Sequence, residues 1–148
     1  MQCRDVMLRF SYRCVETDTA VDCARLMRDH AIGFLPVVDR GGRLIGVVTD
    51  RDLVIRQLAE NRPPNTPVND LMTRSGLLTC HAEEELRAVE ARMAKAEKSR
   101  AVVIDRDGRC VGVVSMSDIA QVEKPEEVGR VLHDVTKREA ARIELPRR

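Results

Sequence analysis

Two stretches of the chain place apolar residues at the spacing of an amphipathic helix. The first follows the candidate N-caps Thr17, Asp18 and Thr19, and its apolar face comprises Ala20, Cys23, Ala24 and Met27. The face of the second comprises Leu86, Val89, Met93 and Ala96. We expect Gly33 to end the first helix. We expect the first turn and the end of the second helix to carry charges that complement its dipole, namely Glu83, Glu84, Glu85, Lys95 and Lys98.

Short apolar runs rich in β-branched residues follow each predicted helix. After the first helix, "LPVV" begins at Leu35 and "RLIGVV" begins at Arg43, with the sequence Asp-Arg-Gly-Gly between them. This composition is typical of a hairpin turn between two strands. After the second helix, Asp-Arg-Asp-Gly from Asp105 has the same chemistry. Each stretch therefore reads as strand, helix, strand, strand and helix.

The two stretches are copies of one another. The 40 residues that begin at Cys14 align without a gap to the 40 that begin at Cys80, at an offset of 66 residues. The pair Val6–Met7 also resembles Leu71–Met72, one residue out of register. This internal repeat predicts a duplicated fold. We place the first repeat at residues 1–60, a proline-rich linker at 61–67, the second repeat at 68–123 and a C-terminal tail at 124–148.

The tail predicts one more helix. One helical face of it carries Val128, Val131, Leu132 and Val135. The favoured interpretation is a helix that covers the core of its own chain or of a dimer partner. The alternative is a docking helix for another protein.

Each copy ends its last strand with Gly-Val-Val, a hydroxyl residue and, three positions later, an aspartate. In the first copy these are Gly46, Thr49 and Asp52, and in the second they are Gly112, Ser115 and Asp118. One interpretation is a capping box, in which the hydroxyl and the carboxylate satisfy the first amides of a helix. The other is a ligand site, where the hydroxyl and helix amides meet a phosphate, Arg51 adds a cation and the carboxylate accepts from a ribose. The glycine would then leave room for a flat base.

Composition removes several classes of function. Lys and Arg number 25 against 24 Asp and Glu, so the net charge of +1 gives no general attraction to nucleic acid or to an anionic membrane. Aromatic residues make up 2% of the chain, which leaves no stacking platform for single-stranded nucleic acid. The sequence has neither an apolar run long enough to span a bilayer nor the apolar stretch of a signal peptide. We therefore expect a cytoplasmic location.

The sequence gives little support to catalysis or metal binding. The chain has 5 cysteines, none of them in a C-x-x-C arrangement, and its three histidines form no ligand motif. Reduced thiols that act as small apolar side chains are the favoured interpretation, with a redox or metal role as the alternative. The chain also lacks a Walker-type loop and an H-E-x-x-H motif. We expect no enzyme activity, no metal and no obligatory cofactor.

The order of helix, hairpin and motif resembles a tandem pair of CBS domains, known as a Bateman module. The stretch "LMRDHAIGFLPVVDRGGRLIGVVTDRDL" carries the most specific part of the resemblance, which covers roughly residues 1–123. The resemblance implies an α+β fold of two βαββα units, packed sheet to sheet about a pseudo-twofold axis, with the C-terminal helix in addition. It implies a regulatory, energy- or metabolite-sensing module that binds AMP, ADP, ATP or S-adenosylmethionine in clefts between the repeats.

The resemblance also implies a role for particular residues. Asp52 would hold a ribose and Thr49 would assist at ribose or phosphate, and Asp118 and Ser115 would do the same in a second cleft. The backbone of the first base pocket would come from Cys14, Val15, Phe34, Leu35 and Pro36. The backbone of the second would come from Cys80, His81, Arg100, Ala101 and Val102.

The second copy departs from this pattern, because Ser117 replaces Arg51 and Arg100 replaces Phe34. We expect the first site to bind more tightly, unless Arg100 reaches a phosphate and compensates. Two functions stay open: the nucleotide-sensing module, and a structural dimerisation or interaction domain with empty clefts. The expected partners are an adenosine nucleotide, a second copy of the chain and an effector protein that acts in trans, with no nucleic acid and no membrane.

Overall fold

The structure, a computed structural model, describes residues 1–9 and 12–137 and divides into two compact units. The first-copy unit comprises Phe10–Leu77 and Ile104–Val111. The second-copy unit comprises Met1–Arg9, Leu78–Val103 and the chain from Gly112 onward. The units therefore do not follow the order of the chain, because the N-terminal residues belong with the second copy.

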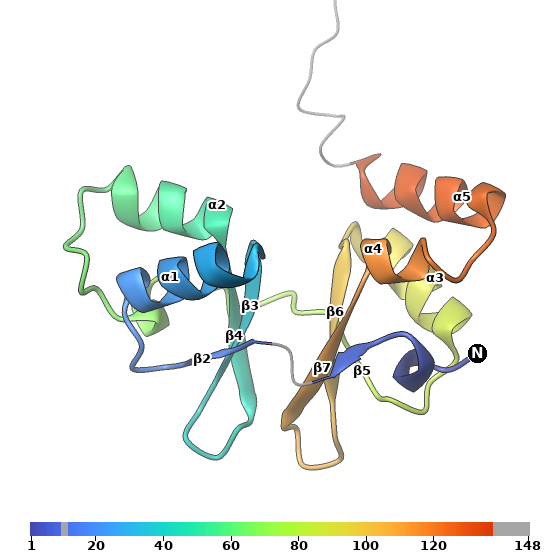
Figure 1. The fold of residues 1–148 in the computed structure, drawn as a ribbon, viewed down its shortest axis with the longest axis horizontal. Coiled ribbons are helices and arrows are strands. Elements are labelled where there is room, and N and C mark those ends of the chain that lie inside the picture. The colour runs from blue at the N-terminus through green and yellow to red at the C-terminus, as the bar shows by residue number, and fades with distance from the viewer. Residues whose placement is uncertain (10–11, 138–148) are drawn as a thin grey trace, which may run out of the picture. The chain divides into compact units, whose positions relative to one another are not determined.

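The first-copy unit is built on a sheet of three strands in the order β2-β3-β4 (Figure 1). β2 (Cys14–Val15) runs parallel to β3 (Phe34–Val38), and β3 is antiparallel to β4 (Leu44–Thr49). Helix α1 (Ala20–His30) connects β2 to β3. A helical segment made of α2 (Asp50–Asp52) and η2 (Leu53–Leu58) follows β4, and the short helix η3 (Val68–Asp70) follows the linker.

The second-copy unit repeats this plan and adds one strand. Its sheet has the order β1-β7-β6-β5, with the bounds β1 (Leu8–Arg9), β7 (Cys110–Ser115), β6 (Arg100–Ile104) and β5 (Thr79–Cys80). Its helices are η1 (Cys3–Asp5), α3 (Leu86–Ala96), α4 (Met116–Ile119) and α5 (Pro125–Val135). The duplicated strand, helix, strand, strand and helix, the α+β class and the C-terminal helix are thus confirmed. The packing of one sheet on the other stays a prediction.

Both hairpins close with the turn chemistry that the sequence predicts. In the first, Gly42 has a φ of 82°, and Asp39 Oδ1 accepts hydrogen bonds from the amides of Gly41 and Arg43 at 2.8 and 2.9 Å. In the second, Gly108 has a φ of 78°. A residue with a side chain is strained at such φ values, which explains the glycine at the end of each turn.

The ends of the two long helices differ in part from the prediction. Thr19 caps α1 and exchanges hydrogen bonds with Asp22, as its sequence indicates. However, α1 ends at His30, and its C-cap Ala31 takes the left-handed conformation with a φ of 52°, two residues before Gly33. Helix α3 begins at Leu86, so the three preceding glutamates lie outside its first turn, and Lys98 lies beyond its end.

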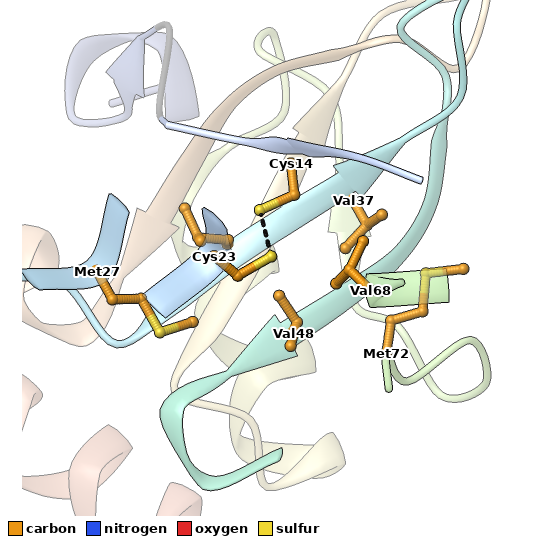
Figure 2. Close-up of a cluster of buried hydrophobic side chains, with 8 residues drawn as sticks. Cys14, Cys23, Met27, Val37, Val48, Val68 and Met72 are labelled. Carbon is orange, nitrogen blue, oxygen red and sulfur yellow. Dashed lines mark hydrogen bonds between the residues drawn. The ribbon is translucent and has the colours of Figure 1, made fainter. Parts of the chain in front are cut away.

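The buried faces of α1 and α3 also differ from the predicted stripes at one position each. Ala24 and Ala96 are exposed, whereas the other predicted positions are buried. In the first-copy unit the core gathers Cys14, Cys23, Met27, Leu35, Val37, Val48, Val68 and Met72 (Figure 2). These residues come from α1, the sheet and the segment that follows the linker, so one apolar cluster joins all parts of that unit.

Helix α5 packs on α3 and α4 of its own unit (Figure 1). Val135 is buried there, whereas Leu132 is 46% exposed. Glu90 on α3 is only 6% exposed, although its counterpart in the first copy, Ala24, faces solvent. The first copy has no helix that corresponds to α5, which explains this difference. Residues 138–148 of the predicted tail lie outside the described residues.

Candidate functional site

Thr49 and Asp52 form a capping box where β4 passes into α2. The Asp52 amide donates to Thr49 Oγ1 at 3.2 Å, and the Thr49 amide and hydroxyl donate to Asp52 Oδ2 at 2.9 and 3.0 Å. The extended backbone of Thr49, with φ −116° and ψ 163°, is what an N-cap residue requires. The box therefore fixes one carboxylate oxygen of Asp52 and leaves Oδ1 outside it.

Ser115 and Asp118 repeat this geometry in the second copy. The Ser115 amide and hydroxyl donate to Asp118 Oδ2 at 2.8 and 2.6 Å, and the Asp118 amide donates to Ser115 Oγ at 3.3 Å. The capping interpretation is therefore correct for both copies. It does not exclude a ligand role, because the second carboxylate oxygen lies outside the box in each case.

Arg56 places a cation beside Asp52, and the sequence motif did not predict this contact. Its Nη2 lies 3.7 Å from Asp52 Oδ1, and its Nη1 donates to the Leu71 carbonyl at 2.8 Å. The side chain of Asp52 is 16% exposed. The counterpart of Arg56 in the second copy is Val122, so the repeat itself marks this contact as a difference between the two sites.

The amides at the start of α2 already have acceptors. The Asp50 amide donates to the Gly33 carbonyl at 3.1 Å, and the Arg51 amide donates to Asp50 Oδ1 at 2.8 Å. With the Asp52 amide bonded to Thr49, the first turn offers no free N–H group to a phosphate. The anion site on these amides stays a prediction, because the acceptor of the Arg51 amide is the exposed side chain of Asp50. The exposed Arg51 offers a side-chain contact to a phosphate at the same turn.

The strand ladder brings Phe34 next to this capped turn. Phe34 lies opposite Thr49 in the β3–β4 register, and Leu35 and Pro36 lie opposite Val48 and Val47. Phe34 is half-buried, whereas Leu35 and Pro36 are buried. Of these three predicted residues, Phe34 therefore has a side chain with access to a ligand beside Thr49 and Asp52.

The structure places Cys14 and Val15 farther along β3. They pair with Val37 and Val38, which at about 3.3 Å per residue is roughly 10 Å from Phe34. The side chain of Cys14 is fully buried. Nearer the chain start, Tyr12 stacks on His30 with ring centroids 3.5 Å apart, and Tyr12 is 43% exposed. No local pattern predicts this ring pair, since the two residues are 18 positions apart.

The second copy shows the same placement with different side chains. Cys80 pairs with Val103 on β6, and the His81 amide donates to Glu84 Oε1 at 2.7 Å. Arg100 is exposed at the start of β6, and Ala101 is buried. The Met116 amide donates to the Ser99 carbonyl at 3.0 Å, as Asp50 does to Gly33. Arg100 therefore stands where Phe34 stands in the first copy.

The motif glycines face neighbouring backbone and not a ligand. A Cβ at Gly46 would lie 2.5 Å from Met72 Sδ, and one at Gly112 would lie 2.8 Å from the Leu8 carbonyl oxygen. Val47 and Thr73 exchange backbone hydrogen bonds at 2.9 and 2.8 Å beside Gly46. The expectation that these glycines leave room for a base is therefore wrong. Gly46 instead admits the segment at Met72 and Thr73, and Gly112 admits the segment at Met7 and Leu8.

The described residues form neither a cluster of metal ligands nor a membrane-spanning helix. Across residues 1–9 and 12–137, no three His, Cys, Asp or Glu side chains gather closely enough to hold a metal ion. In the same part of the chain, every helix is too short or too polar to cross a membrane.

Comparisons with known proteins agree on one family. The family model of the CBS domain matches residues 3–58 and again residues 68–124. The chain is 35% identical over 119 residues to hypoxic response protein 1 of Mycobacterium tuberculosis. The aligned region covers 80% of this chain and 82% of that protein. It is 34% identical over 110 residues to an uncharacterized protein of Methanopyrus kandleri, MK0525, of which it covers 55%.

A solved structure supports the fold comparison. The CBS domain pair of protein MJ0100, in complex with 5′-methylthioadenosine and S-adenosyl-L-methionine, matches with a TM-score of 0.72 and 28% identity. That match covers 82% of this chain and 94% of the other.

Proposed function

The chain belongs to the CBS domain family, and on that premise we propose that it is a regulatory module that binds an adenosine-containing ligand. The observation that carries the proposal is the capped carboxylate at the end of each hairpin. Asp52 and Asp118 each commit Oδ2 to the capping box and keep Oδ1 outside it. A carboxylate oxygen fixed in this way is suited to accept charge-assisted hydrogen bonds from ribose hydroxyls.

The neighbouring side chains suit the other parts of a nucleotide. In the first-copy unit, Phe34 offers an apolar ring beside Thr49 for the base, and Arg51 offers a guanidinium for a phosphate. The MJ0100 pair, solved with two adenosine compounds, supports the choice of ligand class. Within the first-copy unit, Arg51 favours a phosphorylated ligand over S-adenosylmethionine, which has no phosphate.

A second candidate function rests on a different surface. Val54, Ile55 and Leu58 on η2 are 55%, 45% and 70% exposed. Three large apolar side chains on one short helical segment are unusual for a surface that meets only water. This observation favours a dimerisation domain, either as the sole function or together with ligand binding.

Thermal unfolding with a set of ligands tests the proposed function. A ligand that binds only the native state adds about 2.7 kcal/mol at a hundred times its Kd. For a domain of this size that gain raises the Tm by about 5–10 °C. We expect this rise for at least one of AMP, ADP, ATP, S-adenosylmethionine and 5′-methylthioadenosine. GMP and CMP serve as base controls, and an unchanged Tm with all five adenosine compounds contradicts the proposal.

A further inference from the structure

Two cysteines of the first-copy unit lie in direct sulfur contact. Cys14 on β2 and Cys23 on α1 are both fully buried, and their Sγ atoms are 2.9 Å apart (Figure 2). A disulfide has a sulfur–sulfur length of about 2.05 Å, so bond formation requires an approach of about 0.9 Å. Both thiols are free in the structure. The pair is therefore a dithiol that is already positioned for oxidation.

The second-copy unit holds a similar pair. Cys3 in η1 and Cys80 on β5 lie close enough for each thiol to shift the pKa of the other, and the Cys3 amide donates to the Glu84 carbonyl at 2.9 Å. Cys3 is fully buried and Cys80 is 2% exposed. Four of the 5 cysteines in the chain thus form two buried dithiols, with one in each unit.

The internal repeat shows that the second thiol of each pair was placed separately. Cys14 and Cys80 are counterparts at the 66-residue offset, but the counterpart of Cys23 is Val89. Cys3 corresponds in space to Val68. The Cys3 amide donates to the Glu84 carbonyl at 2.9 Å, and the Val68 amide donates to the carbonyl of the Glu84 counterpart, Asp18, at 2.7 Å. Duplication alone would have given both units the same pair. Each strand cysteine instead meets a thiol from a different element.

We infer that each dithiol is a redox site at which a peroxide forms an intramolecular disulfide. In the first step, one thiolate attacks a peroxide oxygen, and a sulfenic acid forms as water leaves. In the second, the partner thiolate attacks the sulfenic sulfur, the S–S bond forms and a second water leaves. Two thiols and one hydrogen peroxide thus give one disulfide and two waters. A small uncharged oxidant suits these sites because both pairs are buried.

The two pairs differ in the effect of their oxidation. A Cys3–Cys80 bond closes a loop of 77 residues, against nine for Cys14–Cys23. A longer closed loop removes more entropy from the unfolded chain, so the Cys3–Cys80 bond raises the Tm more.

The test is a count of thiols after the folded, full-length chain is treated with hydrogen peroxide. The chain is then denatured, alkylated with iodoacetamide and mapped by peptide mass. We expect alkylatable thiols to fall from five to one, with crosslinked peptides for Cys3–Cys80 and Cys14–Cys23 and alkylation at Cys110. The intact mass falls by about 4 Da. Five remaining thiols, sulfinic acids in place of disulfides, or bonds to Cys110 overturn the inference.

The repeat supplies matched variants for this experiment. Cys3→Val and Cys23→Val each introduce the residue that the other copy holds at that place. We expect Cys3→Val to lose only the Cys3–Cys80 crosslink and Cys23→Val to lose only the other, while Cys110→Ser keeps both. Loss of both crosslinks in either valine variant overturns the assignment of two independent pairs. Because mapping of the unsubstituted chain locates the bonds directly, the test does not depend on the folding of any variant.

Discussion

Asp52 Oδ2 accepts two hydrogen bonds from Thr49, one from its amide at 2.9 Å and one from its hydroxyl at 3.0 Å. The bonds make Asp52 part of a helix cap and also determine which carboxylate oxygen is available to a ligand. Loss of this side chain therefore has both a structural and a functional consequence, and a test of its role must separate them.

Asp52→Ala removes the proposed ribose acceptor. A hydrogen bond to a charged group contributes about 1.5–3 kcal/mol, so we expect the affinity for the best adenosine ligand to fall roughly ten- to a hundredfold in calorimetry. Loss of the cap costs about 1 kcal/mol of stability as well. Asp22→Ala is the matched control, because Asp22 forms the same box with Thr19 at the start of α1. Equal affinities in the two variants contradict the ribose assignment.

The two sites are expected to bind a phosphorylated ligand unequally. Arg51→Ser gives the first copy the residue of the second, and Ser117→Arg makes the reverse change. A charge-assisted bond to phosphate is about twice as strong as a neutral one. We expect Arg51→Ser to weaken ATP or AMP binding about tenfold or more and to leave adenosine binding unchanged, since adenosine has no phosphate. Titrations of both variants with both ligands decide this, and an equal loss for adenosine rejects a phosphate role for Arg51.

Glu90 makes the stability of the second-copy unit depend on pH. Burial raises the pKa of this carboxyl, and the nearby Glu123 raises it further. One of its oxygens, Oε1, has no hydrogen-bond partner in the described structure. The carboxyl of Glu90 therefore has a higher pKa in the folded chain than in the unfolded chain. Its contribution to folding stability is fully present below the unfolded pKa, and it is lost as pH rises through the folded pKa.

Glu90→Gln removes this ionisation while it preserves the shape of the side chain. We expect the variant to be more stable than the unsubstituted chain at pH 7, by about 1–3 kcal/mol. The advantage should shrink toward zero as pH falls below about 4, where a glutamate is protonated in the unfolded chain too. Urea unfolding at pH 4, 5.5 and 7 measures it. An advantage that is constant with pH shows that the charge of Glu90 is not its cause.

Glycine substitutions test how the segment before each repeat is held. In Gly46→Ala the new Cβ would overlap Met72 Sδ at 2.5 Å, and in Gly112→Ala it would overlap the Leu8 carbonyl oxygen at 2.8 Å. Overpacking of this kind costs about 1–3 kcal/mol, and Gly112→Ala should cost more because backbone moves less easily than a methionine side chain. Gly129→Ala is the control, since nothing lies within 4 Å of its Cβ position and alanine favours the interior of helix α5 by about 1 kcal/mol. Chemical denaturation of the three variants gives the order.

Homodimerisation is expected to use the exposed apolar face of Val54, Ile55 and Leu58. Leu58→Lys places there the residue that the second copy has at the corresponding position, Lys124. We expect sedimentation to show a dimer for the unsubstituted chain at micromolar concentration and a shift toward the monomer for the variant, because a buried lysine charge opposes association. A monomer in both cases refutes the dimer, and an equally stable dimer in both cases places the interface elsewhere.

Features that depend on near neighbours along the chain could be predicted from the amino-acid sequence alone. The caps at Thr49 and Ser115 and the glycine turns at Gly42 and Gly108 each involve groups within five positions along the chain, so residue type and spacing are sufficient to predict them. The repeat then predicted two similar units, because similar sequences bury similar faces. The left-handed cap of α1 at Ala31 escaped prediction, since a glycine two residues later is the stronger local signal.

Contacts between segments that are distant along the chain became known only from the folded structure. Strand β1 pairs with β7 of the second copy, and Thr73 makes the corresponding contact with Val47 in the first, so each copy is completed by the segment that precedes the other copy. Helix α5 buries Glu90, whereas Ala24 at the same repeat position faces water. The two thiol pairs join residues nine and 77 positions apart. Local patterns do not specify these contacts, because each depends on burying apolar surface between elements that only the folded chain brings together.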